Sequence, residues 1–144
     1  MKVINEMKLD FLSKSANESF GRIAAAAFIS QLDPTVSEIS DIKTAVSEAV
    51  TNSIVHGYEN SIGIISIIIR IFEGDMVEIS VVDRGKGIEN IAKAMEPMFT
   101  TGNEEERSGM GFTVMETFMD KVRVISKPGD GTKVIMIKKL NEDT

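Results

Sequence analysis

Apolar and polar residues alternate in five segments of the chain, and this period of two predicts strands. The alternation places successive side chains on opposite faces of a sheet. It begins with Met7, Leu9 and Phe11 in the segment MKLDFLS. The sequences EGD and PGDG each separate two later segments by a few residues, which is typical of β-hairpins. The predicted strands span residues 7–13, 62–72, 76–82, 122–126 and 132–139.

Between these strands, apolar residues recur at intervals of three and four, which predicts helices. The sequence SANE, Ser15–Glu18, has the spacing of a capping box, and the helix it opens should end before Asp33. The sequence TVSE, Thr35–Glu38, is a second capping box, and its helix should end near Gly57. Shorter helices are expected over residues 89–96 and from the glycines near residue 110 to about residue 120.

The order of these elements predicts one domain, residues 1–144, of the α+β class. The strands come in hairpins, which are antiparallel, and the helices are grouped along the chain. We therefore expect a two-layer sandwich in which helices cover one face of a mixed, mostly antiparallel sheet.

Composition narrows the classes of protein to be considered. The chain has 144 residues, is 42% hydrophobic and 26% charged, and contains no cysteine, so it has no thiolate metal site and no cysteine nucleophile. The sequence shows neither a signal peptide nor an apolar run long enough to span a bilayer, which favours a cytoplasmic protein. The formal net charge of −6 argues against sequence-independent nucleic-acid binding.

A column of polar residues interrupts the second long helix. Glu48, Asn52 and His56 follow one another at four-residue steps, so they should stack in one stripe along the edge of the apolar face. Burying a carboxylate and an amide is unfavourable unless each has a partner. The stripe therefore indicates either a satisfied structural network or the wall of a cleft.

Two glycine clusters suggest close approach to a ligand. Asp83 ends a strand and is followed by Gly85 and Gly87, a pattern that lets the backbone reach a flat ligand. Gly109 and Gly111 precede an apolar helical pattern, and free N–H groups at a helix start can bind phosphate. The cluster is not a Walker P-loop, because no Gly-Lys-Ser/Thr follows it.

Taken together and in order, these motifs resemble those of the GHKL superfamily of ATPases and kinases. EAVTN is similar to its N box, DRGKG to its first glycine box, GMGF to its second, and GDGTKV to its last motif. The resemblance covers residues 11–137. The longer segments SEAVTNSIVHGY and EPMFTTGNEEERSGMGFTVMETFMD resemble more closely the family of sporulation anti-sigma-F factors, which are homodimeric serine kinases.

The resemblance implies the GHKL (Bergerat) fold, ATP or ADP and Mg²⁺ as cofactors, and a role for each polar residue. Asn52 would bind Mg²⁺, and Glu48 would be the catalytic general base for an incoming serine hydroxyl. Asp83 would accept a hydrogen bond from the adenine amino group. His56 is expected to have a structural role.

The glycine clusters would complete the nucleotide site. Residues 97–109 would form a lid over the nucleotide, from which Arg107 would reach the γ-phosphate as a second catalytic group. Arg84 and Lys86 depart from the pattern of the closest relatives, and two outcomes are open: their side chains point to solvent, or they alter nucleotide affinity. The remaining nucleotide-binding residues would be Gly85, Gly87, Ile88, Thr101, Ser108, Gly109, Met110, Gly111, Phe112 and Thr132.

The resemblance also implies protein partners. Arg22 would contact both the sporulation sigma factor F and an anti-anti-sigma protein that is the kinase substrate, so the two would compete. The first strand and first helix would form the dimer region. Three alternatives remain open at this point: an anti-sigma kinase of the stress response, a histidine-kinase-like catalytic domain, and a binding module whose nucleotide is structural.

Overall fold

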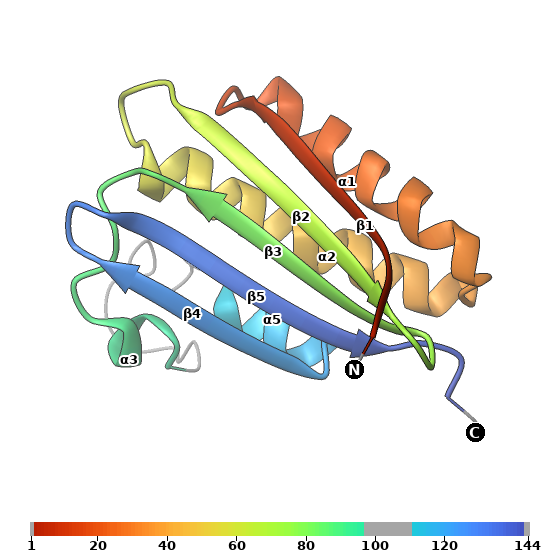
Figure 1. Cartoon of the computed structure of the whole chain (residues 1–144). Coiled ribbons are helices and arrows are strands. Elements are labelled where there is room, and N and C mark those ends of the chain that lie inside the picture. The colour runs from red at the N-terminus through yellow and green to blue at the C-terminus, as the bar shows by residue number, and fades with distance from the viewer. Residues whose placement is uncertain (1, 97–110, 143–144) are drawn as a thin grey trace.

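The computed structural model describes residues 2–96 and 111–142, which form a five-stranded sheet with helices on one face (Figure 1). The order of the strands across the sheet is β1-β2-β3-β5-β4. Both predicted hairpins are therefore present, as β2–β3 and β4–β5. The strands are β1 (Val3–Leu12), β2 (Ile64–Phe72), β3 (Met76–Asp83), β4 (Lys121–Lys127) and β5 (Gly131–Lys139).

The helical layer consists mainly of two long helices and one short one, α1, α2 and α5, which lie behind the sheet in Figure 1. A short helix, α3, lies beyond the end of β3, and it is shorter than the predicted residues 89–96. The helical elements are α1 (Ala16–Ile29), η1 (Ser30–Leu32), α2 (Val36–Asn52), η2 (Ser53–Gly57), α3 (Ile91–Ala94) and α5 (Phe112–Phe118).

The α+β class is confirmed, and the sheet is more regular than expected. All four strand pairs among the described residues are antiparallel, where a mixed sheet was predicted. For β2–β3 and β4–β5 the antiparallel arrangement follows from the connections, because a short turn joins the two strands of each hairpin, which only antiparallel strands allow.

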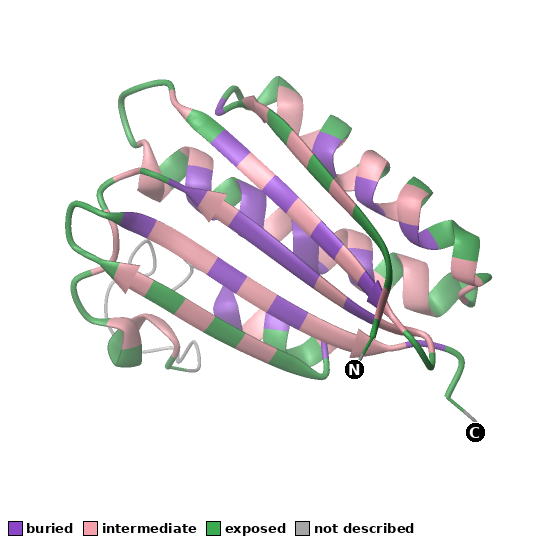
Figure 2. Cartoon of the chain, in the orientation of Figure 1, coloured by how far each residue is buried: buried purple, intermediate pink, exposed green. Residues whose placement is uncertain are grey.

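The core lies between the sheet and the helices (Figure 2). Along β2, buried isoleucines alternate with partly exposed residues, so one face of the strand meets the helices. Ile42, Val46 and Ala49 of α2 are fully buried against this face. This packing places α2 over the ends of β3 and β5, close to the residues that were predicted to form the functional site.

One of the two predicted capping boxes is formed. Thr35 Oγ1 accepts from the Glu38 N–H at 3.1 Å, and Glu38 Oε1 accepts from the Thr35 N–H at 2.9 Å. Ser15 makes no side-chain capping bond within the described residues, because its backbone is already helical (φ −58°, ψ −30°). A capping serine requires an extended conformation. Glu18 instead lies 3.3 Å from Arg22, one turn along α1.

None of the helices among the described residues is both long and apolar enough to cross a membrane.

Candidate functional site

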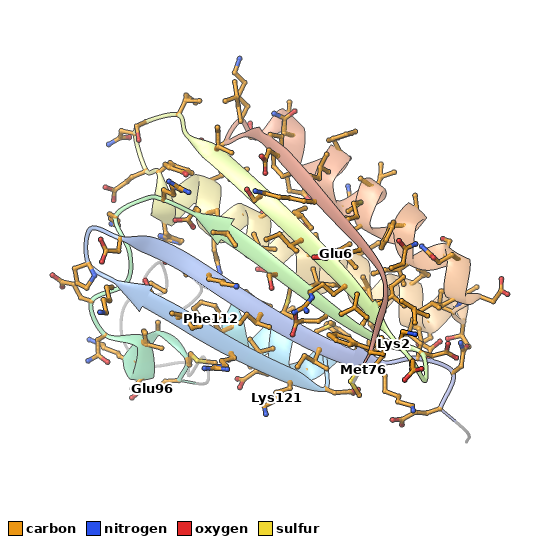
Figure 3. All side chains as sticks on the ribbon, in the orientation of Figure 1. Lys2, Glu6, Met76, Glu96, Phe112 and Lys121 are labelled. Carbon is orange, nitrogen blue, oxygen red and sulfur yellow. The ribbon has the colours of Figure 1, made fainter. Side chains whose placement is uncertain are left out.

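A cavity of about 490 Å³ lies where the end of α2 meets the ends of β3 and β5. Its walls come from six parts of the chain: α2, η2, the end of β3, the turn after β3, the start of α5, and the β4–β5 hairpin. Phe112, labelled in Figure 3, belongs to this lining and is 2% exposed. The lining residues are Ala49, Asn52, Ser53, His56, Gly57, Asp83, Lys86, Gly87, Ile88, Glu89, Phe112, Pro128, Thr132 and Val134.

Asp83 forms a buried acceptor at one end of this cavity. It is the last residue of β3 and is 4% exposed. Ser53 donates its hydroxyl to Oδ2 at 2.7 Å, and the Gly85 N–H donates to Oδ1 at 2.9 Å. A carboxylate has about four acceptor positions, so Asp83 can accept a further hydrogen bond from a group in the cavity.

The end of α2 is shaped to fit around Asp83. After Asn52 the helix continues as a π-helix, in which the Tyr58 N–H donates to the Ser53 carbonyl at 2.9 Å. This winding places more residues in a turn than the α-helix does. Gly57 then packs directly on the Asp83 carboxylate, and a Cβ atom on Gly85 would overlap the Gly57 carbonyl. Glycine is therefore required at Gly85 by close packing of two backbone segments.

A second hydroxyl network holds the neighbouring part of the cavity wall. The Ile88 N–H donates to Ser126 Oγ at 2.8 Å, and Ser126 Oγ also lies 2.8 Å from the Thr132 hydroxyl. Thr132, which was predicted to bind the nucleotide, faces Asp83 in the β3–β5 register, and its described side-chain hydrogen bond is to Ser126. Gly87 has a φ of +79°, which favours glycine, and a Cβ there would overlap the Lys127 carbonyl.

The residues of the predicted polar stripe, Glu48, Asn52 and His56, line two different pockets. Asn52, which is 8% exposed, lines the main cavity together with His56. Glu48 instead lines a neighbouring groove of about 430 Å³, which it shares with Arg22 of α1. Gly111, at the start of α5, lies against Glu48, and a Cβ on Gly111 would overlap Glu48 Oε2. Glu48 therefore sits between the groove and the beginning of α5, one helical turn from Asn52.

Glu48 has an environment suited to binding a proton. Burial raises the pKa of its carboxyl, and the nearby negative charge of Glu18 raises this pKa further. Glu18 itself pairs with Arg22 at 3.3 Å. Glu18 Oε2 and Arg22 Nε are buried, yet neither atom has a hydrogen bond of good geometry to any described residue.

The residues that were predicted to bind phosphate are only partly described. Gly111 precedes α5 and has a left-handed backbone conformation (φ 62°), which glycine adopts more readily than other residues. The predicted lid over residues 97–109 lies outside the described residues. So do Thr101, Arg107, Ser108, Gly109 and Met110.

The side chains of Arg84 and Lys86 point to solvent, which is one of the two outcomes expected for them. Lys86 borders the cavity, but its ammonium group pairs with Glu59 at 2.9 Å, and both side chains are more than half exposed. Arg84 is exposed. The positive charges of Arg84 and Lys86 therefore do not take the place of the groups that hydrogen-bond to Asp83, which are the Ser53 hydroxyl and the Gly85 N–H.

The described residues contain no cluster of three or more His, Cys, Asp or Glu side chains that could hold a metal ion. The donor set nevertheless fits Mg²⁺ that is carried by a nucleotide. Mg²⁺ keeps several waters and takes phosphate oxygens as ligands, so one side-chain oxygen from the protein is sufficient. The nearly buried amide of Asn52 can supply that oxygen at the cavity wall.

Sequence reasoning missed two hydroxyl residues and one glycine of this site. Ser53 was not among the predicted site residues, although the residue is 4% exposed and its hydroxyl therefore needs a partner, which is Asp83. Ser126 looked like an ordinary strand residue, and only the folded hairpin shows that it links Ile88 to Thr132. Gly57 was expected to end the helix, and it also packs on Asp83.

Comparison with known proteins agrees with this architecture. The family described as "Histidine kinase-like ATPase domain" matches residues 15–138. The chain is 63% identical over 143 residues to the anti-sigma F factor of Thermoanaerobacter sp. (strain X514), covering 99% of each chain. It is 59% identical over 138 residues to that of Clostridium beijerinckii, covering 95% of this chain and 96% of the relative.

Solved structures share the fold at low sequence identity. The structure of the RsbU and RsbW domains of Rv1364c from Mycobacterium tuberculosis matches with a TM-score of 0.70 at 19% identity, covering 97% of this chain and 34% of that one. The histidine kinase domain of a blue-light activated kinase from Erythrobacter litoralis matches with a TM-score of 0.55 at 18% identity, covering 85% and 60%. The chain thus belongs to the histidine kinase-like ATPase domain family and, within it, to the family of anti-sigma F factors.

Proposed function

We propose that the protein is an anti-sigma factor and an ATP-dependent protein serine kinase. It binds the sporulation sigma factor F and holds it inactive, and it phosphorylates a serine of an anti-anti-sigma partner. The observation that carries this proposal is the spacing on α2. Asn52 lies in the nucleotide-sized cavity, and Glu48, whose pKa is raised, lies one turn away in a groove that reaches the protein surface at Arg22.

Adenine binds at the Asp83 end of the cavity. Asp83 already accepts from Ser53 and Gly85, and its remaining acceptor capacity suits the adenine amino group. Guanine has a carbonyl at that position, which would face a carboxylate and be rejected. Ile88 and Phe112 contribute the apolar walls that a flat base needs.

The phosphates extend from this end toward Asn52 and the start of α5. Bound Mg²⁺ would neutralise charge on the phosphates during transfer, and Asn52 would hold it through its amide oxygen. Gly111 allows the backbone at the start of α5 to come close to Glu48 and to the phosphate end. In the proposed site Arg107, Gly109 and Met110 act from the segment that precedes α5, with Thr101 and Ser108.

Glu48 acts as the general base. The serine hydroxyl of the partner loses its proton to the Glu48 carboxylate as its oxygen bonds to the γ-phosphorus, while the bond from that phosphorus to the bridging oxygen of ADP breaks. A general base works best with a pKa near the operating pH, so the raised pKa of Glu48 suits this role. The products are phosphoserine and ADP.

Arg22 is the proposed contact for both protein partners. It lies on α1 and lines the same groove as Val36, whose side chain is 88% exposed. An arginine beside an exposed apolar side chain is typical of the residues that dominate protein interfaces. If the sigma factor and the anti-anti-sigma protein both use this surface, binding of one releases the other.

A homodimer is part of the proposal. β1 is an edge strand of the sheet (Figure 1), and the face away from the helices carries Leu12 and Ile64, which are 45% and 55% exposed. Exposed apolar residues on neighbouring strands favour burial against another chain. The first strand would then contribute to the dimer region.

A labelling experiment tests the proposed activity. The protein, its Glu48→Ala variant and its Asn52→Ala variant are incubated with γ-labelled ATP and Mg²⁺ in an extract of sporulating cells. We expect one small labelled protein, stable to acid, that disappears with either variant. Acid-labile label would indicate a histidine kinase, and label on a stress-response partner would indicate the related class of anti-sigma kinase. Release of free phosphate without labelled protein would contradict the kinase assignment.

A further inference from the structure

Tyr58, the residue that follows the π-helical turn, connects two segments that are distant in the sequence. Its hydroxyl donates to the Ile64 carbonyl at 2.6 Å, at the start of β2. The same hydroxyl accepts from the Arg84 N–H at 2.8 Å, directly after Asp83. One phenol oxygen therefore joins the loop before β2 to the turn after β3.

The orientation of the Tyr58 ring is fixed from several sides. Its backbone N–H takes part in the π-helical bond to the Ser53 carbonyl at 2.9 Å, and its own carbonyl accepts from the N–H of Ser61 at 2.7 Å. The ring packs on Gly63, where a Cβ atom would overlap the ring carbons. Because the ring cannot move freely, the position of its hydroxyl is set before any ligand binds.

The turn that Tyr58 holds is the one that shapes the Asp83 site. The Arg84 N–H bonds to the Tyr58 hydroxyl, and the Lys86 N–H bonds to the Gly57 carbonyl at 2.9 Å. Between these two anchors, the Gly85 N–H bonds to the Asp83 carboxylate. Residues 57 and 58 thus hold the turn on both sides of Gly85.

We propose that Tyr58 is a positioning residue for adenine recognition. Its hydroxyl holds the turn after β3, and with it the Gly85 N–H that bonds to Asp83, so that Asp83 faces the cavity in the geometry that the base requires. Tyr58 is not part of the described lining of that cavity, so it acts through the turn and not by touching the base. The inference rests on the proposed role of Asp83 in binding adenine. A site that is ordered in advance binds more tightly because less ordering remains for the ligand to impose.

Replacing Tyr58 by phenylalanine tests this role, because the ring remains and only the hydroxyl is lost. A hydrogen bond contributes roughly 0.5–1.5 kcal/mol net, so the loss of two corresponds to about a 5- to 160-fold effect if all of it reaches the site. We expect Tyr58→Phe to weaken Mg-ADP binding about 5- to 20-fold by calorimetry. Inorganic tripolyphosphate, which has no base, should compete for the phosphate end with unchanged affinity.

A matched control removes a hydroxyl elsewhere. Ser30 lies at the end of α1, is exposed, and donates to the Ala26 carbonyl at 2.7 Å. Ser30→Ala should leave binding of both ligands unchanged. Hydrogen exchange gives a second measurement: the Arg84 amide should lose protection in Tyr58→Phe, while amides of the sheet core keep theirs.

Three results would overturn the inference. They are unchanged ADP affinity in Tyr58→Phe, an equal loss for ADP and tripolyphosphate, and unchanged protection of the Arg84 amide. The second result would assign Tyr58 to general stability. A wild-type protein that bound no adenine nucleotide would overturn the proposed function as well, and this outcome is distinguished by measuring the wild type first.

Discussion

The two ends of the proposed nucleotide site differ in how far their polar groups are satisfied. At the adenine end, Asp83 is paired with Ser53 and Gly85, and Ile88 is held by Ser126. At the catalytic end, burial and Glu18 raise the pKa of Glu48. Buried atoms of Glu18 and Arg22 form an ion pair at 3.3 Å without a well-formed hydrogen bond to the described residues.

The difference reflects what each end has to do. Recognition of a base requires fixed acceptors, and hydrogen bonds among protein groups fix them before the base arrives. Proton transfer requires a group that can change its charge, and such a group must not be fully stabilised in one state. The proposed adenine end is therefore organised as a structural network, and the proposed catalytic end retains charge that a nucleotide or a protein partner can engage.

The largest effect is expected from Glu48→Gln, which keeps the shape of the side chain and removes the base. Phosphate transfer should fall about 10²- to 10⁴-fold, the usual contribution of a general base. Affinity for Mg-ADP should stay within about twofold, because Glu48 lines the groove and not the described nucleotide cavity. Transfer is followed with labelled ATP and binding by calorimetry; a variant that still transfers phosphate at the wild-type rate would remove Glu48 as the base.

The next largest effect is expected at the adenine end. Asp83→Asn replaces a charged acceptor by a neutral amide, and hydrogen bonds to charged groups contribute about 1.5–3 kcal/mol. Affinity for ADP should fall about 10- to 100-fold. Asp130→Asn, in the exposed β4–β5 turn, provides a matched control and should bind ADP normally. Wild-type affinity in Asp83→Asn would contradict the assignment of the base site.

A smaller effect is expected from Arg22→Ala. The variant should bind the sigma factor about tenfold more weakly, because an arginine beside an exposed apolar side chain, here Val36, is typical of an interface anchor. Nucleotide affinity should be unchanged. Arg123→Ala, on the exposed surface of β4, is the control for loss of a positive charge. If Arg22→Ala lost ATP binding and kept its partners, Arg22 would belong to the nucleotide site instead.

The smallest effect concerns the pH dependence of the catalytic end. Removing the charge in Glu18→Gln should lower the pKa of Glu48, although burial, the larger cause, would still keep it raised. The acidic limb of the transfer rate against pH should therefore move to lower pH. An unchanged limb would show that Glu18 does not act on the base.

The same pKa shift has a consequence for stability. Between the ordinary pKa of a glutamate and the raised pKa of Glu48, the folded state binds more protons than the unfolded state, so stability falls as pH rises through this window. Glu48→Gln should thus be more stable than the wild type at neutral pH, and this difference should shrink as pH falls below the window. Thermal unfolding at several pH values measures it.

Local sequence patterns determined the elements of the fold. The alternation of residues gave the strands and both hairpins, and the Thr35–Glu38 capping box forms as its spacing predicts. Turn chemistry and helical periodicity act over a few residues, so these features can be inferred without the rest of the chain. The order of the glycine clusters likewise indicated a nucleotide site, and Asn52, Asp83, Gly87, Ile88, Phe112 and Thr132 do line one cavity.

The tertiary structure alone decided how these residues work together. Ser53 bonds to Asp83 across 30 positions of sequence, and Tyr58 bonds to Arg84 across 26. The π-helical turn brings Ser53 and Gly57 onto Asp83, while the packing of α1 against α2 places Glu48 in a separate groove with Arg22. Such contacts depend on the register of strands and the packing of helices, which short-range patterns do not specify.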